Sequence, residues 1–385
     1  MIDRLKILIF ILLNALTGVA SSQVKVRLFA NRLPESAVFT VISGRYDIVF
    51  FNGEHITVTE NDAVILLRFK GKMAVKIRNS VGYIADSVFF TGMTGKDSFS
   101  LRINGPAPAQ QKYSGDLYCF DDLDTFVLIN NIDTDDYIAG VVKAEGGSGR
   151  NEEYSKTQAV IARTYMYKYF DKHMSDRFSV CDNTHCQAFN GISDDTLINS
   201  ASLETKNLVI TDKDSMLIIS AFHSNCGGES ASSGDVWLAS LPYLKKVNDP
   251  YCFSSKNSVW EKKVSLTDWV DLLKKSGYSG MTDDPNVFKF IQKSRMTRYV
   301  AGSFTMPLNT IRTDLALRST FFSVIPGKDF LNLRGKGYGH GVGLCQEGAM
   351  EMAARGFNFR EIIDYYYAGV SIREVKNAVI LSEKQ

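Results

Sequence analysis

One segment, residues 152–170, constrains the fold of this chain more than any other. Its pattern predicts a helix, and apolar side chains point in nearly every direction around the helix axis. Such a helix has to be covered by other elements on most sides. Arg163 stands in its middle, and a buried guanidinium needs a carboxylate or several carbonyls as partners. The fold must therefore bury this helix together with a partner for Arg163.

Short β-rich runs lie on both sides of this helix. Between residues 24 and 118, runs such as 25–29, 37–42 and 63–67 are separated by Gly, Asn and Asp turns. Further strands are expected at 126–129, 208–210, 217–219 and 321–324, and helices at 266–275, 346–355 and 359–367. We predict an α+β fold, strand-rich and mixed, with a buried helix and C-terminal helices. Its regions are a strand-rich N-terminal region (23–125), in which no catalytic constellation is visible, and a second region (126–378).

The first 22 residues have the pattern of a secretory signal peptide. Arg4 and Lys6 precede an apolar run at 7–13, and small residues follow up to Ser22. The run is shorter than the roughly 18–20 apolar residues of a spanning helix. We expect cleavage after Ala20 or Ser22 and export to the periplasm or the cell wall. The alternative is an uncleaved anchor, the one case in which the protein would contact a membrane.

Composition bounds the size of the core and argues against one class of partner. The 385 residues are 45% hydrophobic with a formal net charge of +2, enough for one large core or two moderate ones. The sequence has no Lys/Arg block, so nucleic acid is not an expected partner.

Four separated blocks resemble the SpoIID/LytB family. They are 130–145 with 158–165, residues 181–187 (CDNTHCQ), residues 222–229 (FHSNCGGE) with 235–237, and residues 337–343 (GYGHGVG) with Gln346 and 348–349. Residues 311–320 also fit the family pattern. The blocks stand in the family's order and cover roughly residues 126–372, so the second region resembles a SpoIID-like catalytic domain.

The resemblance implies a lytic transglycosylase that cleaves peptidoglycan glycan strands already stripped of their stem peptides. The family's acidic catalyst falls on Glu145. Cleavage between N-acetylmuramic acid (MurNAc) and N-acetylglucosamine (GlcNAc) needs a proton on the bridging oxygen, and attack by the sugar's own 6-hydroxyl then needs a base. One carboxyl can do both in turn and leave a 1,6-anhydro-MurNAc end. Such an acid works best with a pKa raised by partial burial, so we expect the buried helix to lie beside the catalytic groove.

Other interpretations of Glu145 remain. It could simply end a helix or pair with Lys143 or Arg163. The family usually has Met-Pro after this glutamate, whereas this chain has Gly146-Gly147. That difference bears on the rigidity of the loop and on glycan length preference.

A second constellation contains Cys181, His185 and Cys186, with His173 as an additional candidate. Related family members can hold zinc here, and thiolate and imidazole are suitable donors for tetrahedral zinc. Such a zinc ion would be structural, and the chemistry itself requires no cofactor. In an exported protein, a Cys181–Cys186 disulfide is the alternative.

The remaining candidates are assigned to glycan binding. They are Arg163, His223, Ser224, Gly227, Gly228, His340 and Gln346. The Gly227-Gly228 turn could donate backbone N–H groups to sugar hydroxyls. The glycine segment 335–343 fails the dinucleotide fingerprint and is interpreted as a loop of close backbone approach. A tight turn, a structural His340 and a Gln346 that caps the following helix are the alternatives.

Two other functions compete with the transglycosylase. LytB-type family members are described as enhancers of a wall amidase, so the chain could be a non-catalytic glycan binder that acts with an amidase partner. A cysteine hydrolase using Cys226 or Cys186 with a histidine is the third possibility, although no local nucleophile signature supports it.

Overall fold

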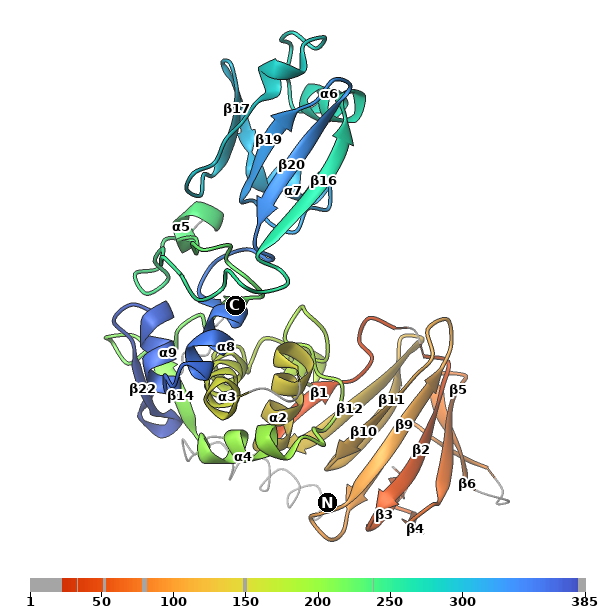
Figure 1. The fold of residues 1–385 in the computed structure, drawn as a ribbon. Coiled ribbons are helices and arrows are strands. Elements are labelled where there is room, and N and C mark those ends of the chain that lie inside the picture. The colour runs from red at the N-terminus through yellow and green to blue at the C-terminus, as the bar shows by residue number, and fades with distance from the viewer. Residues whose placement is uncertain are drawn as a thin grey trace.

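The computed structural model describes residues 23–379 apart from 33, 51–52, 78–81, 148–150 and 238. The predicted signal segment, residues 1–22, lies outside the described residues. The predicted α+β class is confirmed, since several sheets are combined with helices, two of which, at 346–354 and 359–366, are the expected C-terminal helices (Figure 1). Within the described residues, no helix is long and apolar enough to cross a membrane.

Two sheets form the N-terminal region, and the strands that belong to this region pair antiparallel within them. Strand burial alternates along β2 and β3 because successive side chains point to opposite faces, and the inward faces meet in one core that contains Phe39, Tyr46, Phe90 and Phe99. The strands of this region are β1 (Gln23–Arg27), β2 (Ser36–Ser43), β3 (Arg45–Phe50), β4 (His55–Thr59), β5 (Ala63–Phe69), β6 (Lys72–Ile77), β7 (Tyr83–Ala85), β8 (Ser87–Gly92), β9 (Ser98–Asn104), β10 (Ala109–Ser114) and β11 (Asp116–Asp122).

The sheets cross the predicted boundary at residue 125. The seven-stranded sheet has the order β13-β1-β12-β11-β8-β3-β4 and therefore includes β12 (Thr125–Asp133) and β13 (Val180–Cys181). β1 pairs with β12 on one side and, in parallel, with β13 on the other. The second sheet has the order β10-β9-β2-β5-β6-β7. The two predicted regions are thus joined by a shared sheet and not by a linker.

The central layer is helical. α2 (Thr134–Gly146), α3 (Glu152–Lys168) and α4 (Thr196–Glu204) pack against one another beside this sheet (Figure 1). α3 is the helix predicted from the sequence, and its burial is as expected, with most residues from Tyr154 to Tyr167 buried. One face belongs to the core of the N-terminal region and the other to a second core with α8 (Gln346–Ala354) and α9 (Phe359–Tyr366). α3 therefore joins the two cores.

Short pieces complete this part of the molecule. β14 (Leu208–Thr211) pairs with β22 (Ser371–Glu374), and β15 (Phe222–His223) pairs in parallel with β21 (Leu344–Cys345). The strand expected at 217–219 forms only isolated bridges. The other short elements are α5 (Ser233–Val236), η1 (Met174–Asp176), η2 (Pro285–Phe288) and η3 (Val375–Asn377).

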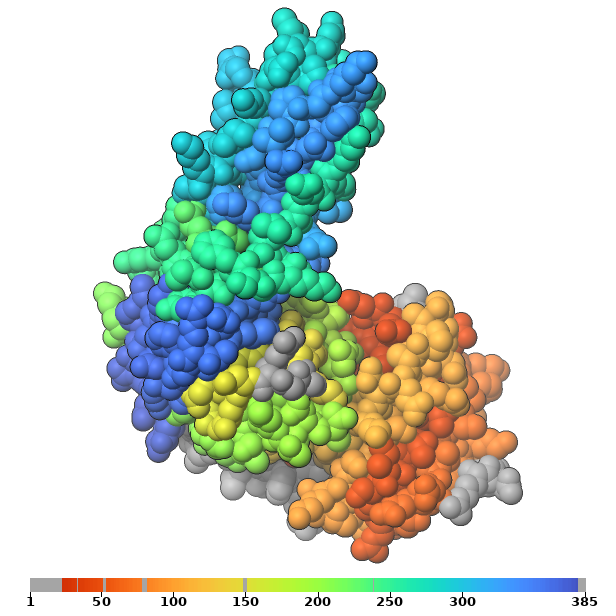
Figure 2. All heavy atoms as spheres, viewed as in Figure 1, coloured from red at the N-terminus to blue at the C-terminus, as the bar shows by residue number. Residues whose placement is uncertain are grey.

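Residues 259–336 form a separate lobe that the sequence analysis did not anticipate. Its core is drawn entirely from residues 260–333, and Figure 2 shows the lobe standing away from the rest of the protein. The helix predicted at 266–275 is α6 (Leu266–Lys275), whose Trp269 and Leu273 fill this core. The other elements are β16 (Val259–Ser265), β17 (Arg298–Ala301), β18 (Phe304–Pro307), α7 (Leu308–Asp314), β19 (Phe322–Pro326) and β20 (Phe330–Lys336).

Candidate functional site

Glu145 lies in the last turn of α2. The helix starts at the cap Asp133, whose carboxylate accepts the Asp135 N–H at 2.8 Å, and ends where Gly147 adopts a φ of 76°. The Glu145 side chain is partly buried, and its Oε1 accepts the Ala188 N–H at 2.9 Å. Burial raises the pKa of this carboxyl, and the Ala188 N–H partly opposes that shift. A partly dry, oriented carboxyl is the form suited to donating a proton.

The two ion pairs considered for Glu145 do not form. Lys143 pairs with the exposed Asp194, and Arg163 pairs with Asp135. Glu145 is therefore not neutralised by either cation.

A polar groove of about 700 Å³ runs beside Glu145. Gly146 and Gly147 form part of its wall and present no side chain, while Ser224 and Gln346 line it from the opposite segments. The Gln346 Nε2 donates to the Glu145 backbone oxygen at 3.1 Å, which ties the start of α8 to the end of α2. The remaining lining residues are Ala144, Tyr251, Ser254, Ser255, Lys256, Asn257, Glu347, Met350, Glu351 and Ala354. Three predicted site residues, Glu145, Ser224 and Gln346, thus share one groove.

Glu347 is a second carboxylate in this groove that the sequence analysis missed. Its oxygens accept from the Asn225 and Asn257 side-chain amides, each at 2.6 Å, and from the Ser255 hydroxyl. The only sequence signal was its position directly after Gln346. Its partners come from segments far away in the chain, so spacing could not have linked them.

His340 lies outside the Glu145 groove. It lines a separate cavity of about 350 Å³ together with Asp235, Arg295 and Arg312. Burial lowers the pKa of His340 to about 4, and the charge of Arg312 adds to that shift. His340 is therefore neutral near pH 7, and its Nδ1 accepts the Val342 N–H at 3.0 Å. A direct role beside Glu145 does not fit this position.

His223 and the glycine turn lie behind the groove. His223 is 4% exposed, its Nδ1 is 3.1 Å from the Val342 oxygen, and burial lowers its pKa. The N–H of Gly227 donates to Asn225 Oδ1 and that of Gly228 to Cys252 Sγ. The expectation that this turn offers its N–H groups to sugar hydroxyls is therefore wrong, because both are already used inside the protein.

The glycine segment is a loop of close backbone approach, as expected, and the nearest atoms to Gly337, Gly339 and Gly343 belong mainly to residues 221–227 and not to the Glu145 segment. A Cβ on Gly339 would lie 2.8 Å from the His223 Cβ, and one on Gly343 would lie 2.0 Å from the Ala221 oxygen. Both glycines have positive φ, at 112° and 72°. The segment serves to pack against residues 221–227.

Arg163 does not reach the groove. Its side chain is fully buried, and its guanidinium donates to Asp135 at 3.0 Å and to the carbonyls of Thr205 and Ser202. The predicted requirement for a carboxylate and carbonyls is met, but the assignment to substrate binding is corrected, because the guanidinium is buried where a sugar cannot reach it. Arg163 joins α2, α3 and α4.

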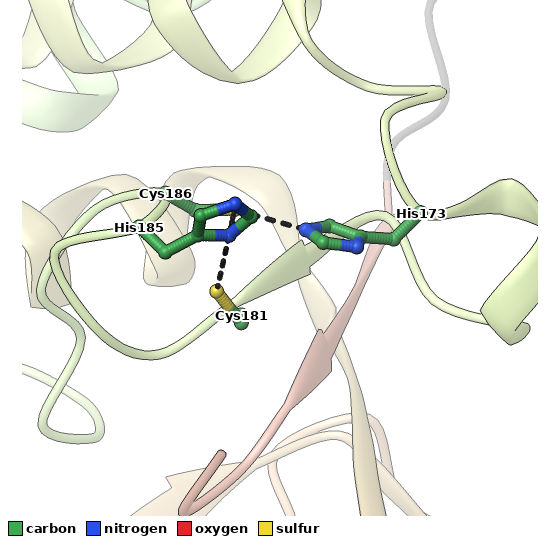
Figure 3. Close-up of side chains that lie close together, drawn as sticks. All are labelled: His173, Cys181, His185 and Cys186. Carbon is green, nitrogen blue, oxygen red and sulfur yellow. Dashed lines mark hydrogen bonds between the residues drawn. The ribbon is translucent and has the colours of Figure 1, made fainter. Parts of the chain in front are cut away.

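Four potential metal ligands converge where β13 ends (Figure 3). His173 follows α3, Cys181 ends β13, and His185 and Cys186 lie on the loop after it. Cys186 Sγ is 3.4 Å from His173 Nε2, and Cys181 Sγ is 3.6 Å from His185 Nδ1. Hydrogen bonds from the Cys186 thiol and His185 lower the pKa of Cys181 and so favour its thiolate. Two sulfurs and two imidazoles at mutual distances within 4.8 Å fit the tetrahedral donor set of zinc.

This cluster is linked to Glu145 through the loop that follows it. Ala188, whose N–H binds the Glu145 carboxyl, comes two residues after Cys186. Gln187 accepts from the Tyr137 hydroxyl on α2 at 3.4 Å. Holding Cys181 and Cys186 together therefore also holds the donor that orients Glu145.

The two predicted cysteine nucleophiles do not face the groove. Cys226 is fully buried and Cys186 is 7% exposed. All six cysteines are free thiols in the structure. A hydrolase built on either thiol has no substrate access in this arrangement.

The fold and the groove define an α+β protein in which Glu145, oriented and partly buried, lies beside a polar groove. Residues 123–211 match the family model described as SpoIID, stage II sporulation protein. An uncharacterized protein of Brachyspira hyodysenteriae is 28% identical over 334 residues, which are 84% of this chain and 85% of that relative. Stage II sporulation protein D of Bacillus subtilis is 27% identical over 263 residues, 64% of this chain and 76% of that protein.

A protein named amidase enhancer, also from Bacillus subtilis, is 28% identical over 288 residues, but these are only 40% of its own length. The family match over residues 123–211 and these relatives show that the chain is similar to proteins of the SpoIID family. The matched segment contains Glu145, Arg163 and the whole His173 cluster.

Proposed function

We propose that this chain is an exported lytic transglycosylase that cuts MurNAc–GlcNAc bonds in peptide-stripped glycan strands of peptidoglycan. The observation that supports this most directly is Glu145 itself. Its carboxyl has a pKa raised by burial, is oriented by the Ala188 N–H, and lies on the wall of a groove of about 700 Å³. Raised pKa and orientation are what a general acid needs near neutral pH.

In the proposed reaction, Glu145 starts protonated. It donates its proton to the oxygen that bridges MurNAc C1 and GlcNAc C4, and the C1–oxygen bond breaks. The 6-hydroxyl of the same MurNAc then attacks C1, and its proton returns to Glu145. The products are a 1,6-anhydro-MurNAc end and a free GlcNAc 4-hydroxyl. The reaction therefore consumes no water and needs no second catalytic carboxylate.

The groove supplies groups suited to a sugar chain. The hydroxyl of Ser224 can exchange hydrogen bonds with sugar hydroxyls, and the amide oxygens of Asn257 and Gln346 can accept them. The Tyr251 ring adds apolar surface to the groove lining. Glu347 fixes Asn257, Asn225 and Ser255. We assign Glu347 to positioning, because its oxygens are already engaged by three donors.

Zinc, where bound, would supply a tetrahedral cross-link and no chemistry of its own. His173, Cys181, His185 and Cys186 would hold it. These residues would then fix the loop whose Ala188 N–H orients the Glu145 carboxyl.

The experiment compares three proteins on purified, peptide-free glycan strands, with fragments read by mass spectrometry. Wild type is expected to release anhydro-ended fragments. Glu145→Gln, which keeps the shape and the acceptor for Ala188, should lose about 10²-fold or more in rate, because the acid and the base are both removed. Glu261→Gln is the matched control, since this exposed glutamate pairs with Arg334 in the separate lobe, and it should cleave like wild type. Undiminished cleavage by Glu145→Gln would overturn the proposal.

A second candidate is supported by the relative named amidase enhancer. In that case the same groove binds glycan but cuts no glycosidic bond, and the partner amidase cleaves its own amide bond in the wall. Wild type and Glu145→Gln would then both fail to cut strands, yet both would bind them and stimulate a wall amidase equally. The two functions are separated by whether anhydro ends appear without any amidase.

A further inference from the structure

A second set of metal-ligating side chains lies at the back of the Glu145 groove. Cys226, Asp249, Cys252 and Cys345 come from three segments, with Asp249 and Cys252 on the same loop, and all four are buried, none more than 1% exposed. Their donor atoms lie within 4.8 Å of one another. Cys226 Sγ is 3.3 Å from Cys252 Sγ and 3.1 Å from Asp249 Oδ2. Nothing in the proposed glycan chemistry uses these groups.

The backbone around the cluster is arranged to donate to sulfur. The N–H of Gly228 points at Cys252 Sγ at 3.2 Å, and the N–H groups of Cys226 and Gly348 point at Cys345 Sγ at 3.3 and 3.4 Å. Such N–H donors stabilise thiolates. Cys345 is also the N-cap of α8, where the helix dipole favours negative charge.

The carboxylate of Asp249 is also oriented by hydrogen bonds. Asp249 Oδ2 accepts the buried Tyr366 hydroxyl at 2.9 Å, and Oδ1 accepts the Tyr251 N–H at 2.9 Å. A Cβ on Gly348 would lie 2.4 Å from Asp249 Oδ2. Orienting partners behind each ligand are typical of metal sites, where they fix ligand direction.

The donor set selects the metal. Three thiolates and one carboxylate form a four-coordinate set for zinc, in which neighbouring sulfurs of a tetrahedron are about 3.8 Å apart given zinc–sulfur bonds of about 2.3 Å. The observed spacing is close to that arrangement. Zinc with four anionic ligands keeps a net negative charge. The half-buried Arg295, whose guanidinium donates to the Cys226 carbonyl at 2.7 Å, and the α8 N-terminus are placed to offset it.

The position of the cluster indicates what a metal would do there. Each cysteine stands within three residues of the groove lining: Ser224 before Cys226, Ser255 after Cys252, and Gln346 after Cys345. The chain also leaves for the separate lobe shortly after Cys252, at β16 (Val259–Ser265). One ion would therefore tie three walls of the groove to the base of the lobe.

We propose that Cys226, Asp249, Cys252 and Cys345 bind a structural zinc ion that holds the groove floor together. This site is distinct from the His173 cluster, and it stands whether or not Glu145 is catalytic.

The test measures zinc per chain by native mass spectrometry and elemental analysis. It uses the full exported chain, purified without chelator, and its Cys345→Ser, Cys181→Ser and Cys119→Ser variants. Cys345→Ser should lose one zinc relative to wild type. Cys119→Ser, which removes a lone buried thiol on β11, should lose none. If the His173 cluster also binds zinc, Cys181→Ser loses a different ion; if it does not, wild type holds one zinc that Cys345→Ser alone removes.

A second measurement covers the case in which Cys345→Ser fails to fold. A Cys181→Ser/Cys186→Ser variant, which lacks both sulfurs of the His173 cluster, should still show sulfur-to-cobalt charge transfer when reconstituted with cobalt. In partly denatured wild type, zinc should slow the alkylation of Cys226, Cys252 and Cys345 together. A peptide linking Cys226 to Cys252 by a disulfide in the exported protein would overturn the proposal. So would an unchanged zinc content in a folded Cys345→Ser variant.

Discussion

At the scale of single residues, the environment of Glu145 predicts how the cleavage rate depends on pH. Burial raises the pKa of its carboxyl above that of an ordinary glutamate. The proposed reaction starts from the protonated form. We therefore expect the strand-cleavage rate to fall as pH rises through this raised pKa, measured as initial rate against pH on peptide-free strands. A rate that stays level well above neutral pH would contradict the assignment of Glu145 as the acid.

The same shift predicts a stability difference. In the native state Glu145 keeps a proton that the unfolded chain has already released, so native stability falls as pH rises from the unfolded pKa through the folded one. Glu145→Gln has no proton to lose. It should match wild type at acid pH and exceed it near pH 7 by roughly 0.5–2 kcal/mol, as buried functional groups often cost. Urea unfolding at the two pH values checks this, and equal curves at both would refute it.

How far these residues were predictable depended on chain distance. Glu145 was found because a family block surrounds it, and Ser224 and Gln346 because two other blocks do. Glu347 could not be predicted, because its place in the site depends on hydrogen bonds from Asn225, Ser255 and Asn257, which lie far away in the sequence. The assignment of Arg163 to substrate was wrong although its need for a carboxylate was predicted, because sequence cannot say on which side of a helix the partner lies.

At the scale of elements, Arg163 holds three helices together. Its guanidinium on α3 binds Asp135 on α2 and the carbonyls of Ser202 and Thr205 at the end of α4. Arg163→Ala would leave Asp135 buried with only the exposed Lys206 as a cation at 3.2 Å. We expect a loss of about 3–5 kcal/mol in the free energy of unfolding, measured by urea denaturation.

Arg334→Ala is the matched control for this prediction, because its ion pair with Glu261 is exposed, and its cost should stay within about 0.5 kcal/mol. Restored stability in the double variant Arg163→Met with Asp135→Asn would attribute the loss to the unpaired carboxylate. A cost for Arg163→Ala no larger than that of the control would refute the structural role.

Elements with a strong local pattern were predictable. α3, α6, α8 and α9 lie within a residue or two of their expected ranges, because the apolar period and the capping residues are local signals. The prediction of a strand at 217–219 was wrong, because an apolar run alone does not show whether another strand is available to pair with it.

At the scale of the whole molecule, the lobe of residues 259–336 is the feature that sequence did not reveal. Its entry and exit meet at a pair of opposed residues, Val259 and Lys336, on β16 and β20. No compositional break marks these ends, because a lobe inserted through paired strands needs no linker. The sheet shared by the two predicted regions at β12 also leaves no compositional break, so it could not be predicted either.

This geometry predicts that the lobe can be removed. Replacing residues 260–335 by a short Gly/Ser linker joins ends that lie about 5 Å apart and leaves every residue of the Glu145 groove in place. The shortened protein should fold cooperatively by circular dichroism, with a lower Tm because the contacts of Arg295 to Cys226 and Glu229 are lost. Arg295→Ala in the full chain should reproduce most of that decrease. An unfolded or aggregated product would show that the lobe is integral to the fold.

The position of β1 also has a consequence for how the molecule is assembled. β1 pairs with segments far away along the chain, since Val26 lies opposite Asn130 on one side and opposite Val180 on the other. Closing such a distant contact early costs chain entropy and slows folding. Both edges of β1 therefore stay open during folding until β12 and β13, which lie more than one hundred residues further along the chain, have reached it.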